Sequence, residues 1–86
     1  MSANSVLVEV LLFAGAAEKV GKRSTSFQLE PGDTIENLQR VLGQQYPDLE
    51  PLLGISRWAV NSEFVDSSYS FRSDMQIALI PPVSGG

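Results

Sequence analysis

The stretch LEPGDTIENLQRVL, residues 29–42, carries the clearest helix signal in the chain. Pro31-Gly32 indicates a turn, and Asp33 or Thr34 is placed to cap the exposed amides of the first helical turn. Four apolar residues then recur at helical spacing and give one apolar stripe: Ile35, Leu38, Val41 and Leu42. The helix is predicted to end before Tyr46-Pro47, because the residue before a proline avoids the helical region.

The segments on the N-terminal side of this helix alternate like strands. Residues 6–14, VLVEVLLFA, place Glu9 on one face and three apolar residues on the other, so these three are predicted to face the core: Val8, Val10 and Leu12. Phe13 then falls on the less buried side. Residues 24–30 point Phe27 and Leu29 inward, and we expect them to form a hairpin with the first strand. The polar connection, residues 15–23, has room for one helical turn that closes at Gly21.

The C-terminal half adds shorter elements. Three leucines predict a short helical plug under the sheet: Leu49, Leu52 and Leu53. Residues 56–65 indicate two short strands around a turn at Asn61-Ser62, and residues 75–80 indicate a last strand. In that strand Ile77 and Leu79 face one way and Ile80 the other. We therefore predict an α+β fold, a mixed four- to five-stranded sheet with one main helix across it and with the first and last strands as central neighbours.

Composition excludes several classes of function. The chain has 86 residues, no Cys and no His, so it cannot build a disulfide framework, a zinc knuckle or a histidine general base. Independent catalysis is therefore not expected, and no metal or cofactor site is predicted. The net charge of −4 disfavours binding to nucleic acid. No apolar run approaches the roughly 20 residues that cross a bilayer, and no signal peptide stands out, so we expect no membrane contact and a cytoplasmic protein.

The final residues IALIPPVSGG, 77–86, pass from an apolar strand through two prolines to two glycines. Pro81 and Pro82 restrict the backbone, and Gly85 and Gly86 carry no side chain. An extended tail from Pro81 to Gly86 spans roughly 18–20 Å. The sequence thus predicts a domain at 1–80 and an extended C-terminal Gly-Gly tail at 81–86. A frayed end is the competing interpretation, since chain termini are commonly disordered.

Two resemblances sharpen this prediction. LEPGDTIENLQRVL resembles the start of the helix in ubiquitin, the prototype β-grasp protein. VEVLLFAGAAEKVG, AVNSEFV and IALIPPVSGG, in this order, resemble the small, sulfur carrier subunit of molybdopterin synthase. This second resemblance covers nearly the whole chain, and its specific part is Pro-Pro-Val-Ser-Gly-Gly. It implies a ubiquitin-like β-grasp fold.

The resemblance also implies a chemistry that is centred on the terminal carboxylate of Gly86. An E1-like adenylyltransferase would use ATP to adenylate it, and a sulfur donor protein would supply the sulfur that makes it a thiocarboxylate, 1-thioglycine. The loaded tail would then enter the large synthase subunit through its preceding residues: Pro81, Pro82, Val83, Ser84 and Gly85. There the sulfur would pass to cyclic pyranopterin monophosphate to form the molybdopterin dithiolene. This chain would be the non-catalytic subunit of a transferase, in a heterotetramer of two small and two large chains.

A docking surface is expected beside the tail. Strand parity places Phe13, Phe64 and Ile80 where they can remain outside the core, and the resemblance implies that they face the large subunit. For Phe64 the core is an equally good place. Trp58, beside Arg57, is interpreted as a core residue rather than a ligand stack.

Other functions remain open at this point. The Gly-Gly ending by itself is compatible with a sulfur carrier for thiamine thiazole synthesis or tRNA thiolation, although such a tail is expected without Pro-Pro-Val-Ser. It is also compatible with a ubiquitin-like protein modifier or a plain binding module.

Overall fold

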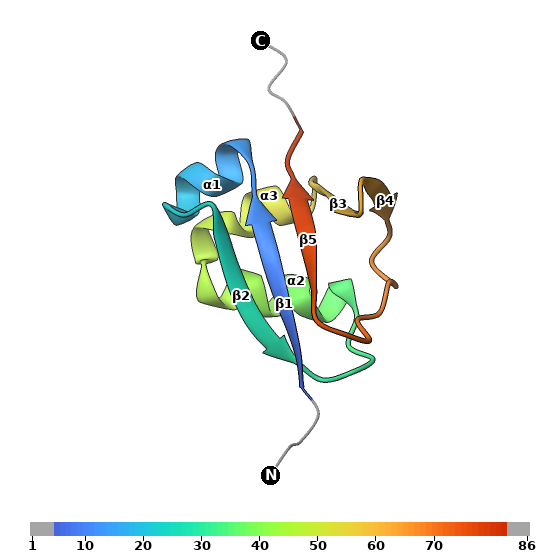
Figure 1. Cartoon of the computed structure of the whole chain (residues 1–86). Helices are drawn as coiled ribbons and strands as arrows, with labels where there is room; N and C mark the ends of the chain where they lie inside the picture. Colours follow the sequence, from blue (N-terminus) through green and yellow to red (C-terminus); the bar gives the residue numbers. More distant parts are fainter. Residues whose placement is uncertain (1–4, 83–86) are drawn as a thin grey trace.

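The computed structural model describes residues 5–82, which form one mixed sheet with helices on one of its faces (Figure 1). The five strands run in the order β2-β1-β5-β3-β4 across the sheet. Their bounds are β1 (Val6–Leu12), β2 (Ser24–Leu29), β3 (Arg57–Val60), β4 (Glu63–Val65) and β5 (Met75–Ile80). β1 pairs with β5 in parallel, and the other three pairs are antiparallel. The predicted hairpin and the predicted central pair of first and last strands are both confirmed.

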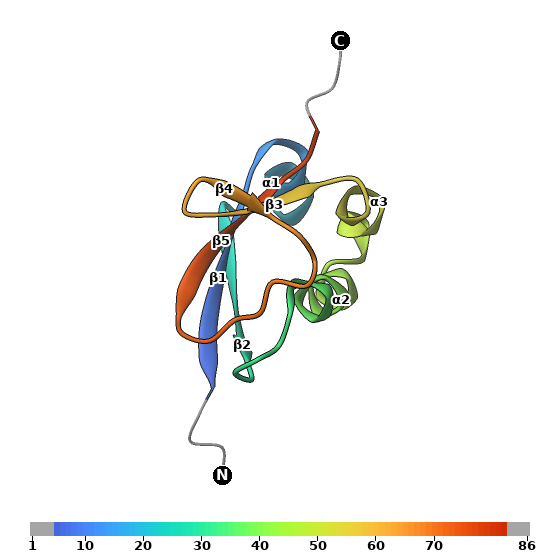
Figure 2. The same ribbon diagram turned by 90° about the vertical axis from the view of Figure 1, so that its right-hand side faces the viewer.

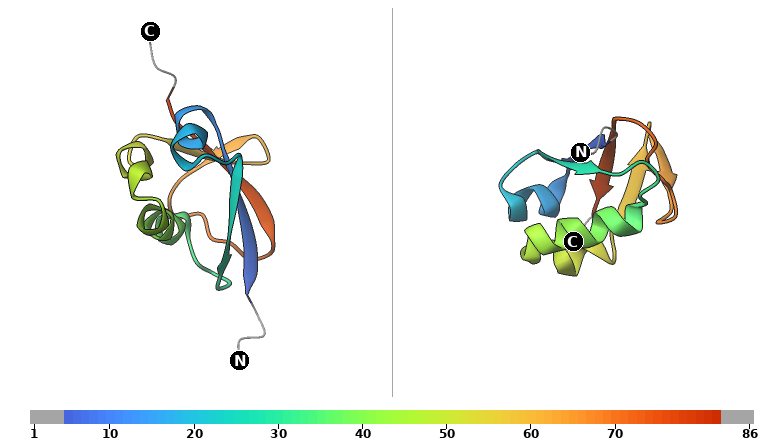
Figure 3. Two further views of the ribbon diagram at one scale, coloured as in Figure 1. Left: turned by 90° about the vertical axis from the view of Figure 1, so that its left-hand side faces the viewer. Right: turned by 90° about the horizontal axis from the view of Figure 1, so that it is seen from below.

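The helices cover one face of this sheet and leave the other bare (Figures 2 and 3). They are α1 (Ala14–Val20), α2 (Ile35–Gln45), the 3-10 turn η1 (Pro47–Leu49) and α3 (Glu50–Leu53). α2 is the main helix that lies across the sheet, as predicted. No helix of residues 5–82 combines the length and the apolar character needed to cross a membrane.

The core lies between α2 and the covered face of the sheet. Val8 and Val10 of β1 are fully buried, and the apolar stripe of α2 packs onto them, with Val41 only partly buried. Leu49 and Leu53 form the predicted plug, and Phe71 from the loop before β5 is fully buried. The alternation in the strands and the stripe in the helix thus identified the inward-facing residues correctly.

The chain leaves β1 earlier than predicted. β1 ends at Leu12, and Ala14 turns the chain with a φ of 51° into a seven-residue helix in place of a single turn. Alanine is the best helix former, and the side chain of Ala16 is buried against the core, so both propensity and packing favour α1. The helix closes at Gly21 with a φ of 79°, where glycine relieves the strain of the left-handed region.

The predicted side-chain cap of α2 is wrong. Neither candidate caps the helix: Thr34 occupies the N-cap position without a side-chain bond, and Asp33 accepts a hydrogen bond from the Glu30 amide instead. The amides of Ile35 and Glu36 donate to backbone carbonyls of the 67–69 loop, at 3.0 and 3.1 Å. These carbonyls satisfy two of the exposed amides of the first turn, which is the role that a side-chain cap would otherwise serve.

Candidate functional site

The tail leaves the domain from the centre of the sheet. β5 lies between β1 and β3, and it ends at Ile80 beside the C-terminal end of β1 (Figure 1). Pro81 is buried and Pro82 is exposed, so the chain passes from the core to the surface within two residues. The remaining residues of the predicted tail, Val83, Ser84, Gly85 and Gly86, lie outside the described residues.

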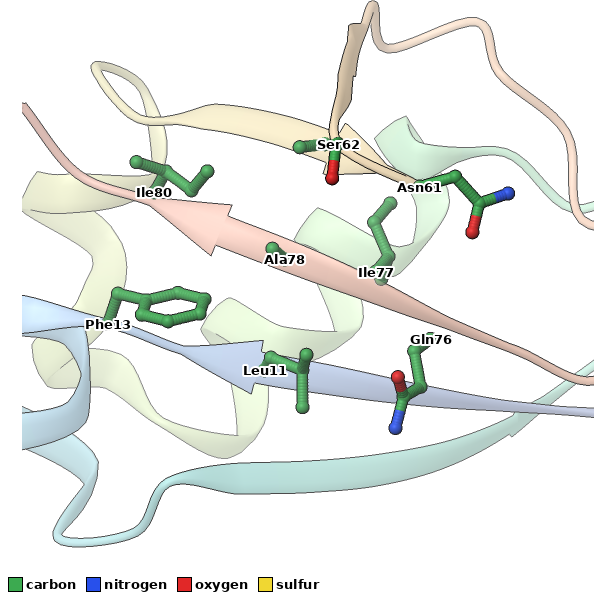
Figure 4. A pocket seen from close by; sticks show the side chains of 9 residues that line it. Leu11, Phe13, Asn61, Ser62, Gln76, Ile77, Ala78 and Ile80 are labelled. Atoms are coloured by element: carbon green, nitrogen blue, oxygen red, sulfur yellow. The ribbon is translucent and has the colours of Figure 1, made fainter.

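The bare face of the sheet carries an open groove at this same end (Figure 4). The groove has a volume of about 350 Å³ and is lined by Leu11, Phe13, Ala59, Asn61, Ser62, Gln76, Ile77, Ala78 and Ile80. Its apolar half lies along the ends of β1 and β5, and its polar half lies at the β3–β4 turn. The groove therefore adjoins the point where the tail begins.

Strand register explains the apolar half. Leu11 stands opposite Ala78 and Leu12 opposite Leu79. Because alternate side chains point to opposite faces, the buried pair Leu12 and Leu79 faces α2, and the pair Leu11 and Ala78 faces the groove. The next outward positions are Phe13 and Ile80, and Figure 4 shows both side chains at the same end of the groove. Phe13 is 47% exposed and Ile80 is half-buried.

Phe64 is a surface residue, with 54% of its side chain exposed. It does not line the groove, but it stands opposite Ala59, which does. The structure thus places Phe13 and Ile80 together in one groove and Phe64 at its border. Trp58, by contrast, is a core residue as predicted, and its Nε1 donates to Gln39 Oε1 at 3.3 Å.

Sequence reasoning missed the polar half of the groove. Asn61 and Ser62 both adopt positive φ, 52° and 69°, as the two central residues of a tight hairpin turn require. The Asn-Ser pair did signal the turn. Its place beside Gln76 depends on the β3–β5 pairing, which no local pattern reveals.

Arg57 is the second residue whose setting was not foreseen. Its guanidinium carbon lies 3.8 Å from the centre of the Phe64 ring, in a cation–π stack. The two residues belong to neighbouring strands of the β3–β4 hairpin, so the contact depends on the register of that hairpin. Only the apolar character of Phe64 and the charge of Arg57 were visible in the sequence.

The groove offers apolar and uncharged polar side chains and no acid–base group. None of the nine residues that line the groove is titratable. The described residues include no cluster of metal-ligating side chains. Two groups with shifted pKa values lie elsewhere. A hydrogen bond with Thr25 lowers the pKa of Tyr46, and hydrogen bonds from Ser68 lower the pKa of Asp66. Neither Tyr46 nor Asp66 contributes to the lining of the groove.

A mixed five-stranded sheet with one main helix across it defines the class of ubiquitin-like β-grasp proteins. The crystal structure of SAMP1 from Haloferax volcanii is similar, with a TM-score of 0.82 and 26% identity over 93% of this chain and 99% of that one. A ubiquitin from Caldiarchaeum subterraneum shares the fold, with a TM-score of 0.66 and 11% identity over 96% of this chain and all of that one.

Within this class the chain belongs to the ThiS family, whose model matches residues 10–86. Relatives named molybdopterin synthase sulfur carrier subunit occur in distant organisms. The protein of Dictyostelium discoideum is 40% identical over 81 residues, 91% of this chain and 94% of its own length. The human protein is 33% identical over 82 residues, 92% of this chain and 93% of its own length. The resemblance noted in the sequence is confirmed.

Proposed function

We propose that the chain is the sulfur carrier subunit of a molybdopterin synthase. The observation that carries the proposal is the place where the tail begins, at the end of a central strand and beside an apolar groove without titratable residues. Such a domain can dock and present its C-terminal residues, while partner proteins supply the catalytic groups. The names of the relatives in Dictyostelium discoideum and human support the same assignment.

The reactive group in this proposal is the carboxylate of Gly86. A carboxylate is a poor electrophile, because its charge repels nucleophiles and its oxygen is a poor leaving group. An E1-like adenylyltransferase joins it to AMP from ATP and releases pyrophosphate, and sulfur from a donor protein then displaces the AMP. The product is a thiocarboxylate. This sequence of steps lets a chain without His or Cys take part in covalent chemistry.

The thiocarboxylate then donates its sulfur to cyclic pyranopterin monophosphate within the large subunit and returns to the carboxylate, and two such donations supply the two sulfurs of the molybdopterin dithiolene. Pro81 and Pro82 limit the conformations that the tail loses when it is captured. Gly85 and Gly86 have no Cβ, so a tunnel can close around the backbone of the tail.

Docking involves the surface that surrounds the start of the tail. We assign Phe13, Phe64 and Ile80 to the interface with the large subunit, in an assembly of two small and two large chains. Phe13 and Phe64 each expose about half of an apolar side chain, and the apolar side chain of Ile80 is half-buried. Burial of such aromatic side chains is a common source of binding energy in protein interfaces.

Mass spectrometry tests the proposal. The intact chain is incubated with the activating enzyme, ATP and a sulfur donor, and its mass is expected to rise by the difference between sulfur and oxygen. A variant with one alanine added after Gly86 is the control, and it is expected to stay unloaded while binding the large subunit. The proposal is wrong if the extended variant, uncleaved, still delivers sulfur and yields molybdopterin.

Similarity to the small archaeal modifier protein SAMP1 favours a second candidate, a ubiquitin-like protein modifier. The same incubation separates the two functions if a cell extract is added. A stable isopeptide bond between Gly86 and a lysine of another protein supports the modifier, and a thiocarboxylate without such conjugates supports the sulfur carrier.

A further inference from the structure

Arg57 is a surface cation at the point where the tail begins. It stands opposite Ile80, the last residue of β5, across the antiparallel β3–β5 pair. Its neighbour Trp58 is buried in the core, so strand alternation directs Arg57 to the bare face of the sheet, where it is exposed. The residue therefore borders the groove on the side away from Phe13.

The stack on Phe64 orders this side chain. With its guanidinium carbon 3.8 Å from the ring centre, one face of the planar group is covered by the aromatic ring. The N–H donors of a guanidinium lie in its plane, so stacking leaves their edge available for a second partner. Arg57 thus presents the donor edge of its guanidinium among outward-facing neighbours that are apolar, Ile80 and Phe64.

The charges of this face favour an acidic partner group. Strand register places two charged residues there, Glu9 and Arg57, and the carboxylate of Glu9 already accepts a hydrogen bond from Gln76 at 2.8 Å. The other cations of the chain lie outside the strands: Lys19 is on α1, Lys22 and Arg23 follow it, Arg40 is on α2, and Arg72 is in the loop before β5. The chain as a whole carries a net charge of −4. A carboxylate is thus attracted at Arg57 and repelled by most of the remaining surface.

We propose that Arg57, held by Phe64, binds an aspartate or glutamate side chain of the large synthase subunit. Apolar side chains of the same partner fill the groove beside Phe13 and Ile80. This inference rests on the proposed function, to which it adds the chemistry of the partner surface. Aromatic residues and arginine are the types that are enriched in the cores of protein interfaces, and bidentate pairing with a carboxylate is the preferred geometry of arginine.

The proposed role is docking and not chemistry. A tail extended from this end of the sheet to Gly86 would span roughly 18–20 Å, and in that conformation the reacting carboxylate would lie beyond the reach of Arg57. Loss of the pair is therefore expected to weaken association with the large subunit. The rate of sulfur transfer at saturating large subunit is expected to stay unchanged.

The test measures the dissociation constant of the complex as a function of salt. The probe is the full chain with the large synthase subunit of the same genome. The variants are Arg57→Gln, Arg57→Lys and, as a control with the same change of charge on α2, Arg40→Gln. Arg57→Gln is expected to weaken binding about tenfold at low ionic strength and to flatten its salt dependence, because screening then has one less ion pair to act on. Arg57→Lys is expected to fall between wild type and Arg57→Gln, since lysine keeps the charge without the planar fork.

A double-mutant cycle tests the contribution of the aromatic ring. Phe64→Leu is expected to cost less affinity in the Arg57→Gln background than in wild type, because the ring acts partly through the arginine. Equal affinity and equal salt slopes for Arg57→Gln and Arg40→Gln would overturn this inference and leave the proposed function intact. Failure of the wild-type chain to bind the large subunit or to carry sulfur would overturn both.

Discussion

Phe13 shows how one position joins the fold to the surface. It is the last residue before α1, and the Ala16 amide donates to its backbone carbonyl at 3.0 Å. The backbone thus helps to begin a helix while the side chain, 47% exposed, lines the groove. Folding constrains the main chain at this position and leaves the side chain available for binding.

Phe13→Ser is therefore expected to weaken binding to the large subunit by about tenfold or more, as for an aromatic anchor at an interface. Serine is a favourable N-cap residue, so α1 is expected to remain intact. Isothermal titration calorimetry measures the change. The matched control is Leu7→Ser, on the same face of the sheet, with a side chain that is 45% exposed near the start of β1, whereas Phe13 directly follows the end of that strand. Equal losses of affinity for the two variants would place the interface elsewhere on the sheet.

At the scale of elements, local patterns predicted what local interactions determine. Alternation revealed the inward faces of β1 and β2, and the spacing of Leu38 and Leu42 revealed the stripe of α2. The length of α1 was underestimated, because its only fully buried side chain is that of Ala16 and one residue gives no apolar stripe.

Long-range contacts explain what could not be predicted. The amide of Ile35 donates to the Tyr69 carbonyl, from a loop far along the chain. The residues next to the helix therefore predicted a side-chain cap that the helix does not have. The stack of Arg57 on Phe64 likewise depends on hairpin register. The site was predictable as a set of apolar residues near the tail, while its polar half and its cation required the pairing of strands.

The β3–β4 turn supports a prediction about stability. Ser62 has a φ of 69°, a region that costs a residue with a Cβ roughly 1–2 kcal/mol. Ser62→Gly is therefore expected to raise the free energy of unfolding by about 1 kcal/mol, in part offset by the greater freedom of glycine in the unfolded chain. Urea denaturation measures this change in the free energy of unfolding. Ser73→Gly, in an exposed loop where the serine φ is not positive, is the control and is expected to give no gain; a gain of the same size there would contradict the argument.

At the scale of the whole molecule, the loop before β5 joins the sheet to α2. Phe71 is fully buried, it meets Tyr69 edge to face with ring centres 5.9 Å apart, and its amide donates to the Asp33 carbonyl at 2.8 Å. The backbone of the same loop satisfies the first amides of α2. This one segment thus contacts both layers of the fold, and its aromatic side chain completes the core.

Phe71→Ala is expected to lower the free energy of unfolding by about 3–5 kcal/mol, the usual cost of deleting a buried phenylalanine. That is a large share of the stability of a domain of this size, which is of the order of 0.05–0.15 kcal/mol per residue. Chemical denaturation followed by circular dichroism measures the loss. Phe64→Ala makes the same deletion at a side chain that is 54% exposed, and it is expected to cost less than about 1 kcal/mol. Similar losses for the two variants would mean that burial does not determine their cost.

The parallel pairing of β1 with β5 has a practical consequence for experiments. Both strands run in the same direction, so the residue that opens β1, Val6, and the residue that closes β5, Ile80, lie at opposite ends of the sheet (Figure 1). A fluorophore or a surface linker attached ahead of Val6 therefore sits a full strand length away from Phe13 and Ile80, where the tail begins. Single-molecule and biosensor measurements can immobilise the protein there without masking the surface that its partners approach.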